Sequence, residues 1–353
     1  MTIHRQSIEE RITWLLDLAR RHTAEFRSPE AYLSRERYRT RHPTAIVVLK
    51  CMDGRINIPV VTNTPLGIIQ PFRNLGGMFD LGWPHLGEVL ANHVQRMVDE
   101  GRRVLIIITY HFSRGDAKRG CAGFAYDTDL ARAHTRRIKN QAEQIFGLGH
   151  ATVYPLICGF ETDEDALLLH GSTDDILDLS AVRPDEHGAL EQRVSDLYPD
   201  MAEQMRIDLH RLILGNLDWI AHTRKTERQL ETSHREWMIC LGRGFDFLHT
   251  PNLALIIGPY SPNLADPIRK AAGIIEANMK EGRIPDDGFL LFSSVPYEEI
   301  GVDQARAELK SRFLEGYAAD VIRNDFPDLA EKMHVMTAVL SWRSRELNIL
   351  RKS

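Results

Sequence analysis

The feature that most constrains the fold is the alternation of apolar segments with amphipathic ones. Residues 45–50 (AIVVLK), 103–111 (RVLIIITYH) and 151–160 (ATVYPLICGF) are almost continuously apolar. Segments of helical periodicity lie between them, over about 86–101 and 127–146. Strands that are buried on both faces have continuous apolar sequences, so this order predicts an α/β fold with a mostly parallel sheet flanked by helices.

Three metal-binding side chains follow two of these strands. Cys51 ends the first strand and His111 ends the second. Cys121 follows after nine intervening residues, which form a Gly-containing basic loop. Right-handed crossovers gather the carboxyl ends of parallel strands at one edge of the sheet, where ligands bind. Two thiolates and one imidazole suit Zn²⁺, and three protein ligands leave the fourth position open, as in catalytic zinc sites.

Two charged residues alternate with the first cysteine. In an extended segment, Cys51, Asp53 and Arg55 point to the same side, because every second side chain shares a face. Arg55 can hold the Asp53 carboxylate through two parallel hydrogen bonds and keep it from ligating the metal. The alternative is an ion pair with a structural role only.

Composition narrows the class of protein. The chain has 353 residues, a formal net charge of −5 and four cysteines. The negative charge argues against a protein that binds nucleic acid or an anionic membrane. Charged residues such as Arg5 and Glu9 interrupt the first twenty positions, so we expect no secretory signal and a location in the reducing cytoplasm.

Three motifs in this region resemble those of a known family. The chain has C-M-D-G-R at 51–55, R-N-L-G-G at 73–77, and a strand that ends in His111 with Cys-Ala-Gly nearby. In order and strand context they resemble the β-class carbonic anhydrases, which have Cys-x-Asp-x-Arg, Arg-Asn-x-Gly and His-x-x-Cys-Gly. One feature departs from the family, because nine residues separate His111 from Cys121 where most members have two. This insertion and the long C-terminal part resemble the divergent carboxysome shell carbonic anhydrases.

The resemblance implies an enzyme that hydrates CO₂ reversibly to bicarbonate, with a zinc-bound hydroxide as the nucleophile. Cys51, His111 and Cys121 are then the predicted zinc ligands. Asp53 would orient the hydroxide and Arg55 would restrain Asp53, so these two are the predicted catalytic residues. The alternatives are a hydrolase of CS₂ or COS on the same scaffold, and a non-catalytic zinc scaffold associated with carboxysomes.

Further candidates surround this predicted site. Turnover requires a proton carrier, for which His234 and His249 are candidates. Gly123 either presents a backbone N–H to bicarbonate or only permits a turn. The acidic segment 161–165 is interpreted as a solvated hairpin rather than a second metal site.

The C-terminal third repeats the pattern in a degenerate form. An apolar segment again runs into a cysteine, Cys240, and NLALIIGPY at 252–260 echoes RVLIIITYH. On that pairing Tyr260 or Ser261 stands where His111 would be, and no second cysteine follows. The chain is therefore predicted to carry a second copy of the domain that lacks zinc ligands.

The predicted organisation has three parts. Residues 1–44 form a helical arm, 45–232 the zinc-binding catalytic domain, and 233–353 the degenerate repeat. We expect small-molecule substrates, neither nucleic acid nor membrane as partner, and a homodimer or higher homo-oligomer. The short arm favours free cytoplasmic function, and association with a carboxysome or with Rubisco is the alternative.

Overall fold

The computed structural model describes residues 3–147, 151–171, 175–226 and 233–352. The chain divides into two compact units, and each is described by itself. The six-stranded unit comprises Leu33–Cys51 and Ile56–Thr232. The five-stranded unit comprises Met1–Tyr32, Met52–Arg55 and Ser233–Ser353. The boundary between the units thus passes between Cys51 and Met52, inside the C-M-D-G-R motif.

The six-stranded unit contains one mixed sheet in the order β2-β1-β3-β4-β5-β6. Its strands are β1 (Ala45–Cys51), β2 (Ile69–Asn74), β3 (Val104–Phe112), β4 (Val153–Glu161), β5 (Ala166–His170) and β6 (Ile176–Asp178). Strands β1 to β4 pair in parallel, and β5 and β6 add antiparallel strands at one edge.

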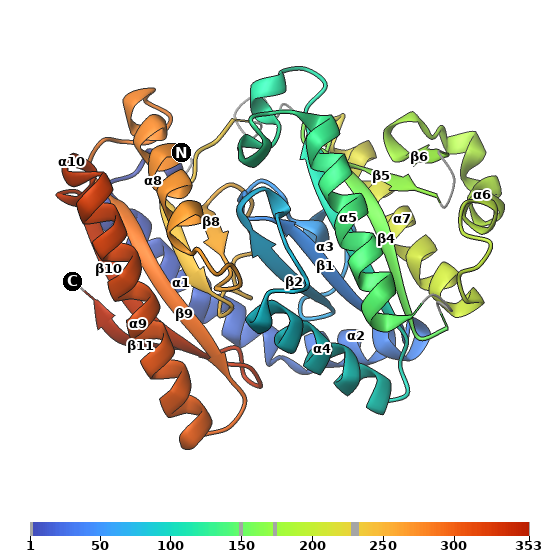
Figure 1. Ribbon diagram of the computed structural model, residues 1–353, viewed down its shortest axis with the longest axis horizontal. Helices are drawn as coiled ribbons and strands as arrows, with labels where there is room; N and C mark the ends of the chain where they lie inside the picture. The colour runs from blue at the N-terminus through green and yellow to red at the C-terminus, as the bar shows by residue number, and fades with distance from the viewer. Residues whose placement is uncertain (1–2, 148–150, 172–174, 227–232, 353) are drawn as a thin grey trace. The chain divides into compact units, whose positions relative to one another are not determined.

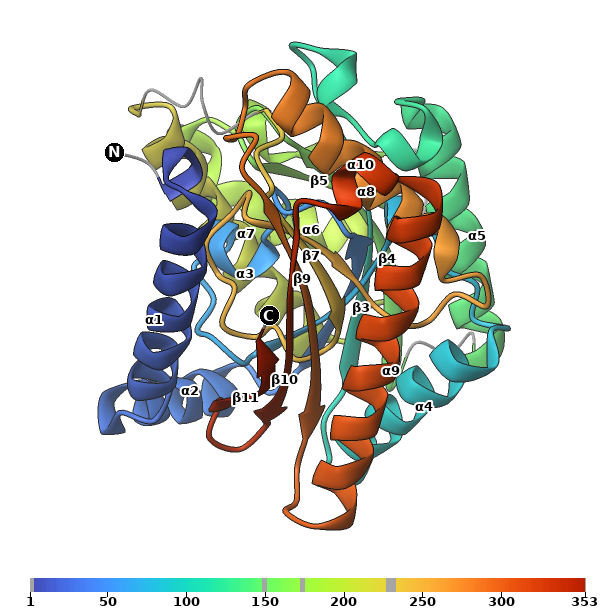
Figure 2. The ribbon, with the colours of Figure 1, turned by 90° about the vertical axis from the view of Figure 1, so that its left-hand side faces the viewer.

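Helices cover both faces of this sheet. They are α3 (Ile58–Val61), α4 (Pro84–Asp99), α5 (Thr128–Phe146), α6 (Leu190–Leu197) and α7 (Glu203–Thr223), with 3₁₀ turns η2 (Leu75–Gly77), η3 (Ala117–Arg119), η4 (Ala122–Phe124), η5 (Leu179–Ala181) and η6 (Pro184–Ala189). Helices α4 and α5 lie on one side of the sheet, and α3 and α7 lie on the other (Figures 1 and 2). The predicted strands, helices and parallel pairing are confirmed, whereas β2 was not predicted.

The five-stranded unit contains a second sheet in the order β11-β10-β9-β7-β8. Its elements are η1 (Ile3–Arg5), α1 (Ile8–Phe26), β7 (Met238–Gly242), β8 (Ala254–Ile257), α8 (Ala265–Lys280), β9 (Phe289–Tyr297), α9 (Val302–Asp325), α10 (Pro327–Ala330), β10 (Met333–Ser341) and β11 (Leu347–Lys352). Helix α1 begins with the capping box of Ser7 and Glu10. Helix α2 (Pro29–Arg41) contains the boundary between the units, between Tyr32 and Leu33.

The two sheets share one topology. In each, the first strand of the copy (β1 or β7) pairs in parallel with the second on one side and with the third on the other. The fourth strand (β4 or β10) continues in parallel, and the fifth is antiparallel. The predicted second copy of the fold is therefore confirmed. The division at residues 44 and 232 stays a prediction.

One prediction about the repeat is wrong. Segment 252–260 contains β8, which takes the position of β2 beside the first strand, and not that of β3. The counterpart of β3 is β9, so the position equivalent to His111 lies near Ser294 rather than at Tyr260 or Ser261. Both segments are short apolar runs that end in a turn, and their composition does not reveal their place in the sheet.

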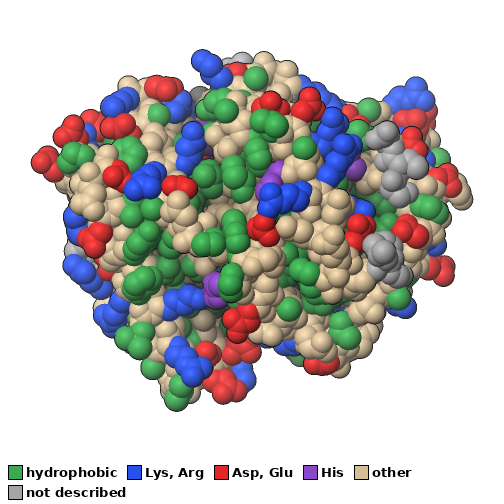
Figure 3. Space-filling model, viewed as in Figure 1, with side chains coloured by type: hydrophobic (Ala, Val, Ile, Leu, Met, Phe, Trp, Pro, Cys, Tyr) green, Lys and Arg blue, Asp and Glu red, His purple; other side chains and the backbone are tan. Residues whose placement is uncertain are grey.

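Charged side chains of both signs are interspersed over the face drawn in Figure 3, in keeping with the small net charge of −5. Among the described residues, no helix combines the length and the hydrophobicity that a membrane span requires.

Candidate metal centre

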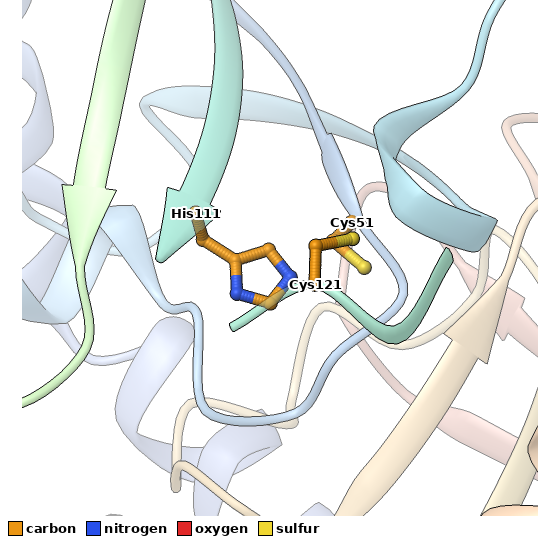
Figure 4. Close-up of side chains that lie close together, drawn as sticks. All are labelled: Cys51, His111 and Cys121. Carbon is orange, nitrogen blue, oxygen red and sulfur yellow. The ribbon is translucent and has the colours of Figure 1, made fainter. Parts of the chain in front are cut away.

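The predicted zinc ligands come together in the six-stranded unit. Cys51 is the last residue of β1, His111 lies near the end of β3, and Cys121 directly precedes η4. One sulfur or nitrogen atom from each residue lies within 4.8 Å of the others. The three side chains point toward one another (Figure 4). They are buried, with exposed fractions of 6%, 2% and 3% in the order given.

Sheet geometry explains why residues sixty positions apart in the chain meet. Strands β1 and β3 are direct neighbours and run in parallel, with Leu49 opposite Ile108. Their carboxyl ends therefore lie at the same edge, as expected for a parallel sheet. Cys121 reaches this edge through the loop that follows β3.

That loop is held by the acidic segment after β4. Asp163 accepts hydrogen bonds from the Ser113 hydroxyl (2.8 Å), the Gly115 amide (2.8 Å) and Arg119 (2.7 Å). Glu161, which is 1% exposed, accepts one from the Arg114 amide (3.2 Å). Segment 161–165 is a hairpin, as predicted, because it joins the antiparallel strands β4 and β5. It is not the solvated hairpin expected, because Glu161 and Asp165 are buried. In the pairing of β3 with β4, Phe112 lies opposite Glu161, which brings the acidic segment next to the loop that follows β3. The sequence alone does not reveal this pairing.

The glycines near the ligands allow close backbone contact. A Cβ on Gly123 would lie 2.7 Å from Cα and 2.9 Å from N of Gly76, so η4 packs directly on η2. Asn74 in the R-N-L-G-G motif donates to the carbonyl of Met78 (2.7 Å) and so closes that loop. Gly123 thus brings the loop of Cys121 against the loop that follows β2, while its predicted contact with bicarbonate stays a prediction.

The donor set fits zinc. Two sulfurs and one imidazole nitrogen are the ligand types that Zn²⁺ prefers in tetrahedral sites. Among the protein groups alone, the hydrogen bond with Cys121 and then burial raise the pKa of the Cys51 thiol well above its ordinary value. A divalent cation between the sulfurs would supply the positive charge that favours their thiolate forms.

Asp53 and Arg55 form the bidentate pair expected from the sequence, and both belong to the five-stranded unit. Arg55 Nε donates to Asp53 Oδ1 (3.0 Å) and Arg55 Nη2 to Oδ2 (2.6 Å), while the Arg55 amide also donates to Oδ1 (2.8 Å). Their exposed fractions are 3% and 5%. A buried carboxylate with three charge-assisted or backbone donors is fixed in orientation.

His234 extends this pair. Arg55 Nη2 lies 3.0 Å from His234 Nε2, and an arginine can only donate, so Nε2 is the acceptor. His234 Nδ1 then donates to Glu236 Oε2 (2.9 Å). Glu236 is fully buried and also accepts from the Gly54 amide (3.2 Å). Burial alone would raise the pKa of Glu236, but the interaction with His234 lowers it below its ordinary value.

Glu236 was not predicted, although the alternation His-Arg-Glu at 234–236 puts His234 and Glu236 on one side of an extended segment. His249 lies in a different cluster of the same unit. Its ring stacks on His22 with a centroid distance of 5.4 Å, and His22 Nε2 lies 3.3 Å from Asp246 Oδ2. The structure thus joins His234, but not His249, to the Asp53–Arg55 pair.

Comparison with known proteins agrees with the motifs. Residues 42–186 match the family model described as the carboxysome shell carbonic anhydrase, catalytic domain. The chain resembles the carboxysome shell carbonic anhydrases. The matched region contains Cys51, His111 and Cys121 as well as the C-M-D-G-R motif. The resemblance predicted from these residues is therefore confirmed for this region.

The remaining comparisons add less. Among solved structures the chain is similar to that of the β-carbonic anhydrase CcaA, with 15% identity, a TM-score of 0.28, and coverage of 44% of this chain and 87% of that one. No curated protein matches the chain.

Proposed function

We propose that this protein is a zinc-dependent carbonic anhydrase that interconverts CO₂ and bicarbonate. The observation that carries the proposal is the buried group of Cys51, His111 and Cys121, whose donor atoms lie within 4.8 Å of one another. The family resemblance over residues 42–186 also supports it. When bound there, Zn²⁺ would lower the pKa of a coordinated water toward neutrality and so provide a nucleophile for CO₂.

The side chains then divide the remaining work. Cys51, His111 and Cys121 would hold the metal, and three protein ligands are the number typical of a catalytic zinc. Asp53, two residues from Cys51 in the chain, would accept a hydrogen bond from the nucleophile and so orient it. Arg55 keeps both Asp53 oxygens engaged at 3.0 and 2.6 Å, which prevents the carboxylate from becoming a fourth ligand.

Proton release needs a carrier between the site and buffer. We retain His234 as the first candidate, because it contacts Arg55 directly, and His249 as the second. Gly123 stays a candidate for binding bicarbonate through its backbone N–H. Because the matched family is carboxysomal, we propose a cytoplasmic or carboxysomal location.

Metal analysis paired with stopped-flow CO₂ hydration tests the proposal on the purified full-length chain. We expect a single zinc per chain and CO₂ hydration that is lost on chelation and restored by Zn²⁺. If the protein binds zinc and hydrolyses CS₂ or COS but does not hydrate CO₂, the alternative substrates are the correct ones. A zinc protein without any of these activities would indicate a structural metal, and a chain that binds no zinc would refute the proposal.

A further inference from the structure

Helix α9 of the five-stranded unit has two apolar faces. The inner face packs on the sheet through small and aliphatic residues: Ala307, Ser311, Leu314, Ala318 and Ile322. The outer face carries large apolar side chains whose exposed fractions are 71% for Val302, 70% for Leu309, 68% for Phe313 and 37% for Tyr317. Ile300, just before the helix, is 87% exposed.

These residues form one continuous stripe. Val302, Leu309 and Phe313 are spaced by seven and four positions, and Tyr317 follows four positions later, so they share one side of the helix. The rings of Phe313 and Tyr317 stack with centroids 6.2 Å apart. Hydrophobic side chains gather along the line of α9 in Figure 3, which is drawn from the same side as Figure 1. Scattered exposed apolar residues need no explanation, but a contiguous stripe marks an interaction surface.

We propose that this stripe, defined as Val302, Leu309, Phe313 and Tyr317, binds the same stripe of a second copy of this chain. The two α9 helices would run antiparallel about a two-fold axis that passes between Leu309 and Phe313. Such an isologous contact uses one patch twice and requires it to complement itself.

The charges beside the stripe favour this occupant and this direction. Arg306 and Asp320 are exposed and stand seven residues before and seven after Phe313, on the same side of the helix. In the antiparallel arrangement, Arg306 of each copy lies within about one helical turn of Asp320 of the other. A parallel arrangement would instead place like charges side by side.

The flanking charges disfavour an anionic membrane as the occupant. A helix that binds such a surface carries mainly basic residues beside its apolar face. Here acidic and basic residues alternate around the stripe, with Asp303, Glu308 and Asp320 among Arg306, Lys310 and Arg312. Self-association uses both signs of charge, whereas an anionic bilayer would repel the carboxylates.

The contact is small. One face of a single helix offers less than the roughly 800 Å² per partner that is usual in stable complexes. The dimer should therefore dissociate on dilution, with a dissociation constant in the micromolar range or weaker.

Sedimentation equilibrium of the full-length protein, over a concentration range centred on micromolar, tests the proposal. Phe313→Glu should raise the dimer dissociation constant by at least about thirtyfold, as for the central residue of an interface. Leu130→Glu is the matched control, because Leu130 on α5 is also exposed, at 59%, and lies outside the stripe. Circular dichroism and thermal unfolding of each variant check that the fold is kept.

Charge exchange gives a second test that leaves the apolar stripe intact. Arg306→Asp and Asp320→Arg should each weaken the dimer severalfold at low salt, and both changes in one chain should restore it. A wild-type monomer at all concentrations, a dimer that survives Phe313→Glu, or a double variant weaker than either single one would overturn the proposal. Zinc content and CO₂ hydration are measured separately, so failure here leaves the proposed function untouched.

Discussion

In the six-stranded unit, β1 ends at Cys51 and its neighbour β3 brings His111 to the same edge. In the five-stranded unit, the equivalent strand β7 ends at Gly242, opposite Ser294 of β9. A Cβ on Gly242 would lie 2.2 Å from the Ser294 carbonyl oxygen, so the backbones at this edge are in direct contact. The same strand order therefore has different ends in the two copies. In one copy the strand ends carry the candidate metal ligands Cys51 and His111, and in the other the backbones of Gly242 and Ser294 are in contact.

The polar clusters of the five-stranded unit also differ from the Cys-His-Cys group, because each of them includes an arginine. Asp53 with His234 and Glu236 is paired with Arg55, and Asp246 with His22 and His249 is paired with Arg345 at 2.8 Å. In both, a guanidinium supplies the positive charge that a metal ion would otherwise bring. Thiolates and imidazole select zinc, whereas carboxylates within reach of arginine are already neutralised.

Replacing one cysteine by serine in each copy should give the largest difference in zinc content and activity. Cys51→Ser should remove zinc and CO₂ hydration almost completely, because it deletes a soft ligand from a three-ligand site. Cys240→Ser in β7 is the matched control: this cysteine is also buried in the first strand of its copy, and its loss should leave the zinc content unchanged. Elemental analysis and stopped-flow hydration measure both. Equal zinc loss in the two variants would contradict the assignment of the metal to one copy.

Asp53→Asn tests the next largest effect. The substitution keeps the shape of the side chain but removes the charge that Arg55 binds. We expect zinc to be retained and CO₂ hydration to fall by about 10²–10⁴-fold, the usual contribution of a positioned proton acceptor. Full activity in the variant would mean that the Asp53–Arg55 pair is structural only, like the ion pair of Asp246 with Arg345.

A pair of glycines tests how tightly each unit is packed around its strand ends. Gly123→Ala should destabilise the six-stranded unit by about 1–3 kcal/mol and weaken zinc binding, because the new methyl meets the Gly76 backbone at 2.7 Å. In α8 of the other unit, a Cβ on Gly273 meets nothing within 4 Å, so Gly273→Ala should stabilise its helix by up to about 1 kcal/mol. Urea unfolding and zinc titration of both variants provide the measurements. Similar effects of both changes would refute the close contact of η4 with η2.

His234→Gln separates two roles of one side chain. If His234 carries protons, the variant should lose about tenfold or more in turnover, and added imidazole buffer should restore it. If it mainly holds Arg55 through Nε2, buffer should not restore the loss, and Glu236→Gln should reproduce it because the carboxylate fixes the imidazole tautomer. Turnover measured against buffer concentration distinguishes the outcomes. Unchanged turnover in both variants would exclude both roles.

The sequence predicts much of this arrangement because the signals are local. Continuous apolar runs identify β1, β3 and β4, and the ends of two of these strands identify Cys51 and His111. What it does not predict depends on pairing between distant segments. Glu236 meets His234 only in an extended conformation beside the 52–55 segment, and Asp163 meets the loop of Cys121 only because β4 lies next to β3. The wrong assignment of segment 252–260 as the counterpart of β3 has the same cause, because the position of β8 in its sheet depends on strand pairing.

The smallest expected difference between the two units is in their loss of stability at acid pH. It arises from a histidine in the fifth strand of one copy. Burial, together with the charges of Arg132 and Arg136, lowers the pKa of His170 in β5 to about 4, and its Nε2 lies 2.8 Å from the Tyr110 hydroxyl. The equivalent strand β11 (Leu347–Lys352) contains no histidine.

Because the unfolded chain binds a proton at His170 below pH about 6.5 and the folded chain does not, stability should fall between pH about 6.5 and 4. The loss attributable to this residue should be about 1–2 kcal/mol after allowing for partial solvation. His170→Gln keeps a hydrogen-bonding group near Tyr110 but cannot titrate. Urea unfolding at pH 7 and pH 5 should therefore show a smaller acid loss in the variant than in the wild type. Hydrogen exchange should place the difference in the six-stranded unit, and identical acid losses would show that His170 is already protonated in the folded protein.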